Sequence, residues 1–226
     1  MSSPILLAYD FDGEGGGQSV SDKAISRELK KETLAWVHLD LAHPDTKPWL
    51  DKEISYLDPF VVDALLAEET RPRIAEIGNG ALIILRGVNL NENADPEDMV
   101  SIRLWIDPAR IVSVQRRQLK AVPDIEERIK AGKGPKDAGQ FINMLISRLT
   151  ERMAPVLLEL DEETDNVEEK ILENPDTILR EQIIGIRKEA IILRRYMAPQ
   201  KDAIGQLRLS DLPWIGVPHK RHLQES

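Results

Sequence analysis

The chain has 226 residues, of which 42% are hydrophobic and 31% charged, so it can bury a substantial core and is richer in charge than an average globular domain. Its 39 acidic and 30 basic side chains give a net charge of −9, which argues against a general nucleic-acid binder because such proteins present a basic surface to phosphate. It has no cysteine, so disulfides and thiolate zinc sites are excluded, and any metal must be bound by carboxylate, carbonyl or imidazole groups.

No segment has the pattern of a targeting or membrane-spanning element. The first residues lack the basic start and apolar run of a secretory signal peptide. The longest apolar stretch is 81–85, far shorter than the roughly 20 residues that cross a bilayer. We therefore expect the chain, as given, to be soluble.

The first two thirds of the chain predict a mixed α/β (α+β) domain. A central sheet is expected from short runs of alternating apolar residues, and flanking helices from the amphipathic segments between them. Residues 12–21 are expected to form a glycine-rich loop, and Gly78-Asn79-Gly80 a turn between two strands. The predicted strands are 4–9, 34–39, 73–77, 81–89, 99–106 and 110–115, and the predicted helices are 22–32, 45–57, 59–67 and 123–131.

From Asp137 onward the spacing of apolar residues lengthens from two to three or four, which predicts one or two long amphipathic helices. Pro155 lies inside this segment. Because an interior proline costs about 3 kcal/mol, we expect a bend or a break near Met153. The apolar stripe consists of Ile142, Ile146, Leu149, Met153, Val156, Leu160, Val167 and Ile171.

A second long helix is predicted after the turn Asn174-Pro175-Asp176, over residues 177–197, ending at Pro199. Two long helices joined by a short turn predict an antiparallel hairpin. The predicted parts are thus an α/β domain over 1–136, a long helical hairpin over 137–199 and the start of a stalk helix over 200–226. The third part is interrupted at Pro213, and we expect it to continue beyond residue 226.

The first hairpin helix carries the densest acidic run of the sequence. Residues 151–176 contain ten acidic and two basic side chains. Clustered carboxylates suit hard divalent cations such as magnesium or calcium, and the alternative is a solvated helix face. The candidate metal ligands in this run are Asp161, Glu162, Asp165, Glu168 and Glu169.

The second hairpin helix carries a basic set that could face this acidic run and pair with it across the hairpin. Pairing between the helices is a simpler explanation of these bases than a nucleic-acid surface. The set consists of Arg187, Lys188, Arg194, Arg195 and Lys201.

Two histidines near the end of the chain form a second candidate metal site. His219 and His222 are three residues apart, so on a helix they share a face and their imidazoles could hold zinc. Lys220 and Arg221 lie between them and would oppose a cation.

An enzyme is not indicated. The glycine-rich segment 12–17 follows a predicted strand, but the sixth position of a dinucleotide fingerprint is Gln18 rather than glycine, and no Lys-Ser/Thr pair follows. No catalytic triad or carboxylate pair can be argued from spacing. A nucleotide-binding α/β enzyme with a helical tail remains one alternative, and a soluble α/β protein with a coiled-coil interaction module remains another.

Several blocks, in order, resemble the CorA/ZntB family of divalent-cation transporters. The most specific is the run 193–202, which closely resembles the Arg-Arg-Tyr-Met-Ala-Pro-Gln-Arg-Asp run of the zinc-transporter branch, ZntB. The Leu-Pro-Trp block of the same branch is matched at 212–214. Together the blocks cover nearly the whole chain. The remaining blocks are 35–40, the Arg-Pro turn at 70–73, the Ile-Val-Ser strand at 110–114, and 134–137.

The resemblance implies the cytoplasmic part of a homopentameric, funnel-shaped transporter at the inner membrane, with two membrane helices following this chain. It implies Zn²⁺ or Mg²⁺ as transported or regulatory ions, no tightly bound cofactor and no nucleic-acid partner. In the magnesium branch a carboxylate of the short helix before the Arg-Pro turn helps to bind regulatory metal. That position is Ala64 here, which favours the zinc branch or a different regulatory site. Which metal moves, in which direction and with what proton coupling stays open.

Overall fold

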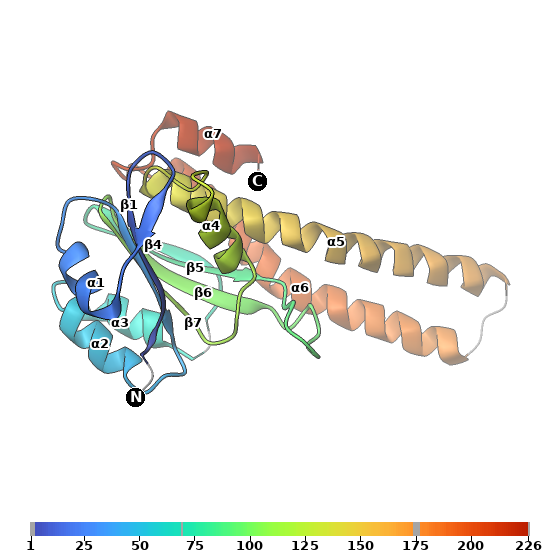
Figure 1. Cartoon of the computed structure of the whole chain (residues 1–226). Helices are drawn as coiled ribbons and strands as arrows, with labels where there is room; N and C mark the ends of the chain where they lie inside the picture. The colour runs from blue at the N-terminus through green and yellow to red at the C-terminus, as the bar shows by residue number, and fades with distance from the viewer. Residues whose placement is uncertain (1–2, 69, 174–176, 226) are drawn as a thin grey trace.

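The structure is a computed structural model that describes residues 3–68, 70–173 and 177–225, with the side chains of 172, 173, 177 and 178 left aside. A seven-stranded sheet forms its centre, in the order β2-β1-β3-β7-β6-β5-β4 (Figure 1). Only β3 and β7 run parallel, and the other neighbours are antiparallel, so the sheet is mixed as predicted. The strands are β1 (Ile5–Phe11), β2 (Gly17–Ser19), β3 (Ala35–Asp40), β4 (Arg73–Ile77), β5 (Gly80–Gly87), β6 (Val100–Ile106) and β7 (Arg110–Gln115).

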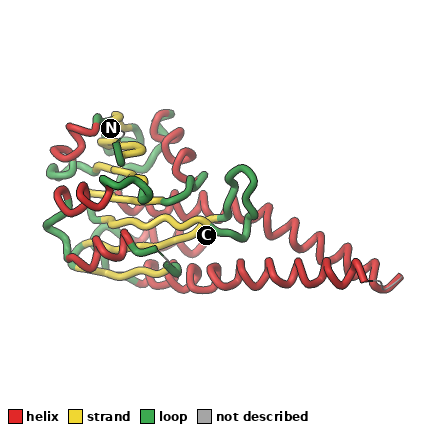
Figure 2. The backbone as a smooth tube through the Cα atoms, turned by 90° about the horizontal axis from the view of Figure 1, so that it is seen from below, coloured by secondary structure: helices red, strands yellow, loops and turns green. Residues whose placement is uncertain are grey.

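Helices cover both faces of this sheet. One face packs against α1, α2 and α3, and the other packs against α4, the first part of α5, the end of α6 and α7. Beyond the sheet, α5 and α6 continue as a bare hairpin that projects from the α/β part (Figures 1 and 2). The helices are α1 (Asp22–Glu28), α2 (Thr46–Glu53), α3 (Pro59–Leu66), α4 (Ala121–Lys130), α5 (Ala138–Glu173), α6 (Thr177–Leu209) and α7 (Val217–Glu225).

The packing of α5 on the sheet forms the centre of the larger core. Trp36 of β3 and Phe141 of α5 are both fully buried, and their rings meet edge to face with centroids 4.9 Å apart. Edge-to-face pairs add to the stabilisation that burial provides. The predicted stripe supplies the rest of this face of α5, because Ile142, Ile146 and Leu149 are almost completely buried.

The two prolines of the hairpin do not end a helix, so the predicted break near Met153 and the predicted end of the second helix at Pro199 are wrong. The alternative of a bend near Met153 stays a prediction. α5 continues through Pro155, since Met153 and Val156 on either side are buried while the proline ring is exposed. α6 continues through Pro199 to Leu209, because the following turns are buried against the sheet, where Gln200 is only 7% exposed. Burial on both sides outweighs the hydrogen bond that each proline removes.

The glycine-rich loop was only partly predicted. Gly17–Ser19 forms the short edge strand β2, paired with the end of β1. Gly15 has a φ of +106°, and the main-chain NH of Gly134 donates to its carbonyl oxygen at 2.6 Å. The other predicted strands and short helices are confirmed with shifts of a few residues. The predicted turn Asn174-Pro175-Asp176 lies outside the described residues.

Within the described part of the chain, every helix is too short or too polar to cross a lipid bilayer.

We predict that Phe141→Ala lowers the free energy of unfolding by about 3–5 kcal/mol, because it opens a cavity in the packed centre and removes the ring contact with Trp36. Urea unfolding followed by circular dichroism measures this. Leu6→Ala is the control, since Leu6 is 51% exposed, and its change should stay within about 0.5 kcal/mol. Equal effects of the two substitutions would contradict the assigned core.

Candidate functional site

The junction between the sheet and the helical hairpin is held by hydrogen bonds between side chains and backbone groups. The pairing of β4 with β5 ends at Arg73 and Ile84, two residues before Arg86. At Arg86 the side chain of Gln200 contacts the strand: the Arg86 NH donates to Gln200 Oε1 at 2.7 Å, and Gln200 Nε2 donates to the Arg86 carbonyl at 3.0 Å. One amide thus satisfies two partly buried backbone groups that would otherwise be costly.

The guanidinium of Arg86 completes this junction. It donates to the Thr70 carbonyl from Nε at 3.1 Å and from Nη2 at 2.8 Å, and to the Met99 carbonyl from Nη1 at 2.7 Å. The Arg86 Cζ also lies 4.1 Å from the ring centroid of Tyr196, a cation–π contact. Tyr196 and Gln200, both within the run 193–202, thus attach α6 to β5. We call this set the α6 clasp: Arg86, Tyr196 and Gln200.

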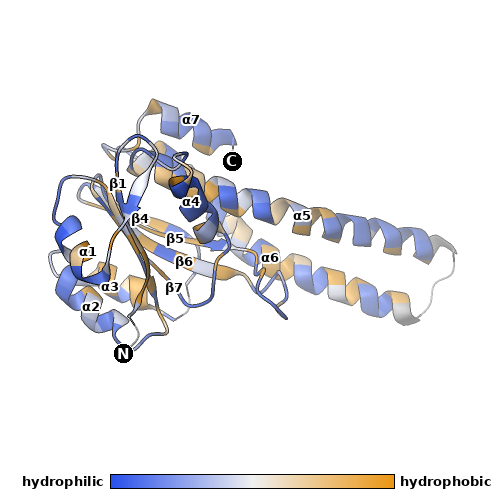
Figure 3. Cartoon of the chain, in the orientation of Figure 1, coloured by the Kyte–Doolittle hydropathy of each residue, from blue (hydrophilic) through white to orange (hydrophobic). Residues whose placement is uncertain are grey.

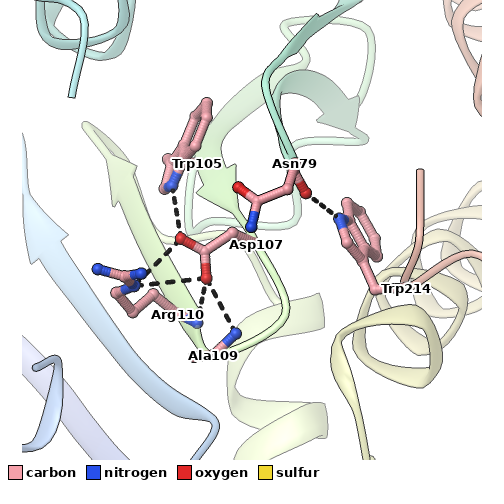
Figure 4. A network of polar contacts seen from close by, with 6 residues as sticks. All are labelled: Asn79, Trp105, Asp107, Ala109, Arg110 and Trp214. Carbon is pink, nitrogen blue, oxygen red and sulfur yellow. Dashed lines mark hydrogen bonds and ion pairs between the residues drawn. The ribbon is translucent and has the colours of Figure 1, made fainter. Parts of the chain in front are cut away.

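A second attachment holds the connection between α6 and α7. Trp214 Nε1 donates to the carbonyl of Asn79, in the β4–β5 turn, at 2.9 Å (Figure 4). The neighbouring β6–β7 turn is ordered by Asp107, whose carboxylate accepts from Trp105 Nε1 at 3.3 Å and pairs with Arg110 at 3.1 Å. The Leu-Pro-Trp block thus places the start of α7 next to the ends of the central strands.

The predicted histidine site is used to hold α7 against α5. His219 Nδ1 accepts from the Gly216 NH at 3.1 Å, so its Nε2 carries the proton and faces Asp137 at 3.3 Å. His222 Nε2 lies 3.1 Å from the hydroxyl of Ser147. A Cβ at Gly139 would collide with the His219 ring, so glycine is what permits this close approach. A zinc ion on the two imidazoles would have to displace these contacts, and the site stays a prediction.

The predicted acidic run is exposed along α5. Within the described residues, no group of three or more histidine or carboxylate side chains is placed so that it could hold a metal ion. Direct ligation by these side chains therefore stays a prediction. The exposed carboxylates in question are Asp161, Glu162, Asp165, Glu168 and Glu169.

The predicted pairing between this acidic run and the bases of α6 is wrong. Among the described side chains, α5 forms ion pairs only through Arg148 with Glu151 and Arg152 with Asp124. The inner face of the hairpin is instead apolar, with Val167 and other side chains buried between the helices. The bases are all exposed: Arg187, Lys188, Arg194, Arg195 and Lys201.

One carboxylate of α6 has an unusual environment. Burial, followed by the nearby carboxylates of Glu97 and Glu163, raises the pKa of Glu189 above its ordinary value. Glu189 lines an open pocket of about 650 Å³ between the two hairpin helices and the loop after β5. The carboxylates of the acidic run therefore also affect the electrostatic potential at the second helix.

We predict that Gln200→Ala lowers the free energy of unfolding by about 1–3 kcal/mol, because two backbone groups of Arg86 lose their partner. Urea unfolding measures the loss, and hydrogen exchange should quicken at the Arg86 amide. Gln206→Ala, at an exposed position of the same helix, should change neither quantity. Unchanged exchange at Arg86 would show that the contact does not protect the strand.

We predict that Glu189→Gln raises the melting temperature at pH 7 by about 1–3 °C in low salt. The folded-state pKa is raised, so the charged form is destabilised in the folded chain above that pKa, and the cost disappears as the pH falls through it. The gain should vanish near pH 3, well below the ordinary carboxyl pKa of 4.5, where the carboxyl is protonated in both states. Differential scanning calorimetry at both pH values measures it, with Glu181→Gln as the exposed control.

Comparisons with known proteins agree with this architecture. Residues 31–226 match the family model described as "CorA-like Mg2+ transporter protein". The chain is 34% identical over 223 residues to the zinc transport protein ZntB of Yersinia enterocolitica, covering 99% of this chain and 67% of that protein. It is 38% identical over 217 residues to the divalent cation transporter CmaX of Pseudomonas aeruginosa, covering 93% and 64%. The chain thus spans about two thirds of the length of these relatives.

Solved structures extend the comparison to the fold. Full-length CmaX matches with a TM-score of 0.88 at 37% identity, covering 98% of this chain and 68% of that chain. The cytoplasmic domain of ZntB from Vibrio parahaemolyticus matches with a TM-score of 0.84 at 26% identity, covering 99% and 89%. The CorA magnesium transporter of Methanocaldococcus jannaschii, 18% identical, shares the fold with a TM-score of 0.76. The chain therefore belongs to the CorA-like transporter family and has the fold of the ZntB cytoplasmic domain.

Proposed function

We propose that this chain is the cytoplasmic domain of a divalent-cation transporter that moves zinc rather than magnesium. The observation that carries the proposal is the match of 99% of the chain to a structure described as the ZntB cytoplasmic domain. The zinc preference rests on the ZntB relatives and on Ala64, which is buried and has no carboxylate where the magnesium branch places one. The complete protein would act as a homopentamer at the inner membrane, with this domain on the cytoplasmic side.

The domain would act by transmitting movement between its parts and by attracting cations, and not by catalysing a reaction. The α6 clasp and the Trp214 contact fix both later helices to the sheet, so a displacement of the sheet moves the hairpin and α7 together. The exposed carboxylates of α5 would raise the local concentration of cations around the inner mouth of the pore, because a surface of one charge sign concentrates ions of the other. The transported Zn²⁺ or Mg²⁺ is cargo, and no tightly bound cofactor or nucleic acid is part of the proposal.

The test is metal uptake by the complete protein in lipid vesicles, with zinc and magnesium compared under identical conditions. We expect zinc uptake to exceed magnesium uptake. If neither zinc nor magnesium is taken up, the proposal is contradicted and a helical interaction module without transport is favoured.

The electrostatic role has its own test in the same assay. Neutralising Asp161, Glu162 and Asp165 to the corresponding amides should lower the initial rate of uptake about threefold in low salt, and the difference should disappear in high salt. A matched control removes three exposed carboxylates from the α/β part, Asp22, Asp51 and Glu76. Equal losses from both triple variants would mean that net charge, and not the acidic run, sets the rate.

A further inference from the structure

The outer face of α6, turned away from α5, carries a regular apolar line that nothing in the described chain covers. Ile184 is 66% exposed and Ile191 is 57% exposed. Seven residues make almost two helical turns, so these two side chains lie on one line along the helix. Figure 3 shows orange segments along α6, interspersed with blue ones.

Three arginines follow the same repeat beside this line. Arg180, Arg187 and Arg194 are also seven residues apart, and each is exposed. Each arginine lies three or four residues from an isoleucine, the spacing of neighbours on a helix surface. The outer face of α6 thus has an apolar line with a positive edge, the pattern of a helix that packs lengthwise against another helix.

The outer face of α5 has the complementary pattern. Leu158 is 59% exposed, and Glu162, Asp165 and Glu169 follow at four, seven and eleven residues, which places all four side chains on one face. This face therefore offers an apolar contact next to a row of carboxylates. In Figure 3 the far half of α5 is correspondingly mostly blue.

These two faces cannot meet within one hairpin. The inner faces of the helices are buried against each other through residues such as Val167 and Leu193, so the outer faces point in opposite directions. Among the described side chains, no ion pair within 4.0 Å joins the carboxylates of this face to the arginines of α6. Both patterns remain available to a partner.

We propose that the outer face of α6 in one copy of this chain docks against the outer face of α5 in a second copy. The inference rests on the proposed function, in which the complete protein is a homo-oligomer, and it identifies the surfaces through which neighbouring copies would contact each other. Because the two faces differ and lie on opposite sides of the hairpin, each copy contacts one neighbour through its α6 face and the other neighbour through its α5 face. Such a head-to-tail contact closes into a ring when the rotation allows it.

The register of the contact follows from the hairpin. α5 ends at Glu173 and α6 begins at Thr177, so residues equally far from the turn lie at the same level. In the proposed ring the symmetry axis runs along the hairpin. The rotation that relates neighbouring copies then involves no translation along the helices, so residues at the same level in one copy stay at the same level in the next. Leu158 then meets Ile191, and Glu169 meets Arg180. The apolar contact supplies most of the attraction, and the charges set the register and exclude other pairings.

Charge reversal in the complete protein tests the contact. Arg180→Glu with Arg187→Glu, or Asp165→Lys with Glu169→Lys, should each lower the association constant between copies at least about tenfold by sedimentation equilibrium. The chain that carries all four substitutions should recover to within about threefold, because the charges are exchanged and not removed. Arg117→Glu with Lys133→Glu, on exposed parts of the α/β domain, should leave association unchanged.

Crosslinking identifies what covers the face. The chain contains no cysteine, so Leu158→Cys with Ile191→Cys introduces one on each outer face. A short bis-maleimide should link copies into a ladder, whereas neither single variant should give more than dimers. A photo-crosslinker at position 191 should label α5 of another copy. Labelling of lipid, or of another segment of the same copy, would overturn the proposal, as would failure of the fourfold variant to recover.

The outcome separates this contact from the proposed function. If the charge-reversed proteins assemble and transport normally, the interface is wrong while the transporter assignment stands. If assembly follows the charge swap but no divalent cation is taken up, the interface stands and the transporter assignment is wrong.

Discussion

The structure depends on how the backbone NH and carbonyl groups of β5 find hydrogen-bond partners beyond the end of β4. β5 is longer than its edge neighbour, so the NH and carbonyl of Arg86 need partners in a partly buried position. The side-chain amide of Gln200 bonds to both of these groups. For this contact to form, α6 must lie beside the edge of the sheet with Gln200 opposite Arg86. The direction of the hairpin, the tolerance of Pro199 and the approach of α7 follow from that position.

The chain is consequently divided into a well-attached end and a lightly packed end. Near the sheet, α5 and α6 are held by buried aromatic and aliphatic side chains, by the clasp and by the ion pair between Arg152 and Asp124. Farther from the sheet the hairpin helices have fewer buried side chains, and most of their surface is exposed. A hairpin built in this way leaves its outer surfaces exposed along its length, where a neighbouring copy can reach them.

Periodicity in the sequence was sufficient for the strands, the short helices and the hairpin, because a change from a period of two to one of three or four reflects directly which face is buried. It failed at the prolines, since the cost of a lost hydrogen bond is local while the burial of Met153 and Gln200 depends on the sheet. It also failed for β2, where a three-residue strand with a glycine has no pattern. Arg86 could not be found, because nothing local distinguishes it from an exposed strand arginine.

The candidate sites show a related limit. Counting charges on the two hairpin helices suggested that they pair with each other. Their angular positions instead place Glu162, Asp165 and Glu169 of α5 on one outer face and the three arginines of α6 on the opposite one. An isolated hairpin gains little from such an arrangement, because separated opposite charges in water attract weakly. A repeated hairpin gains from it at every junction, since each positive edge then lies next to a negative one. The charge pattern of α5 and α6 is therefore better explained by neighbouring copies than by the fold of one chain.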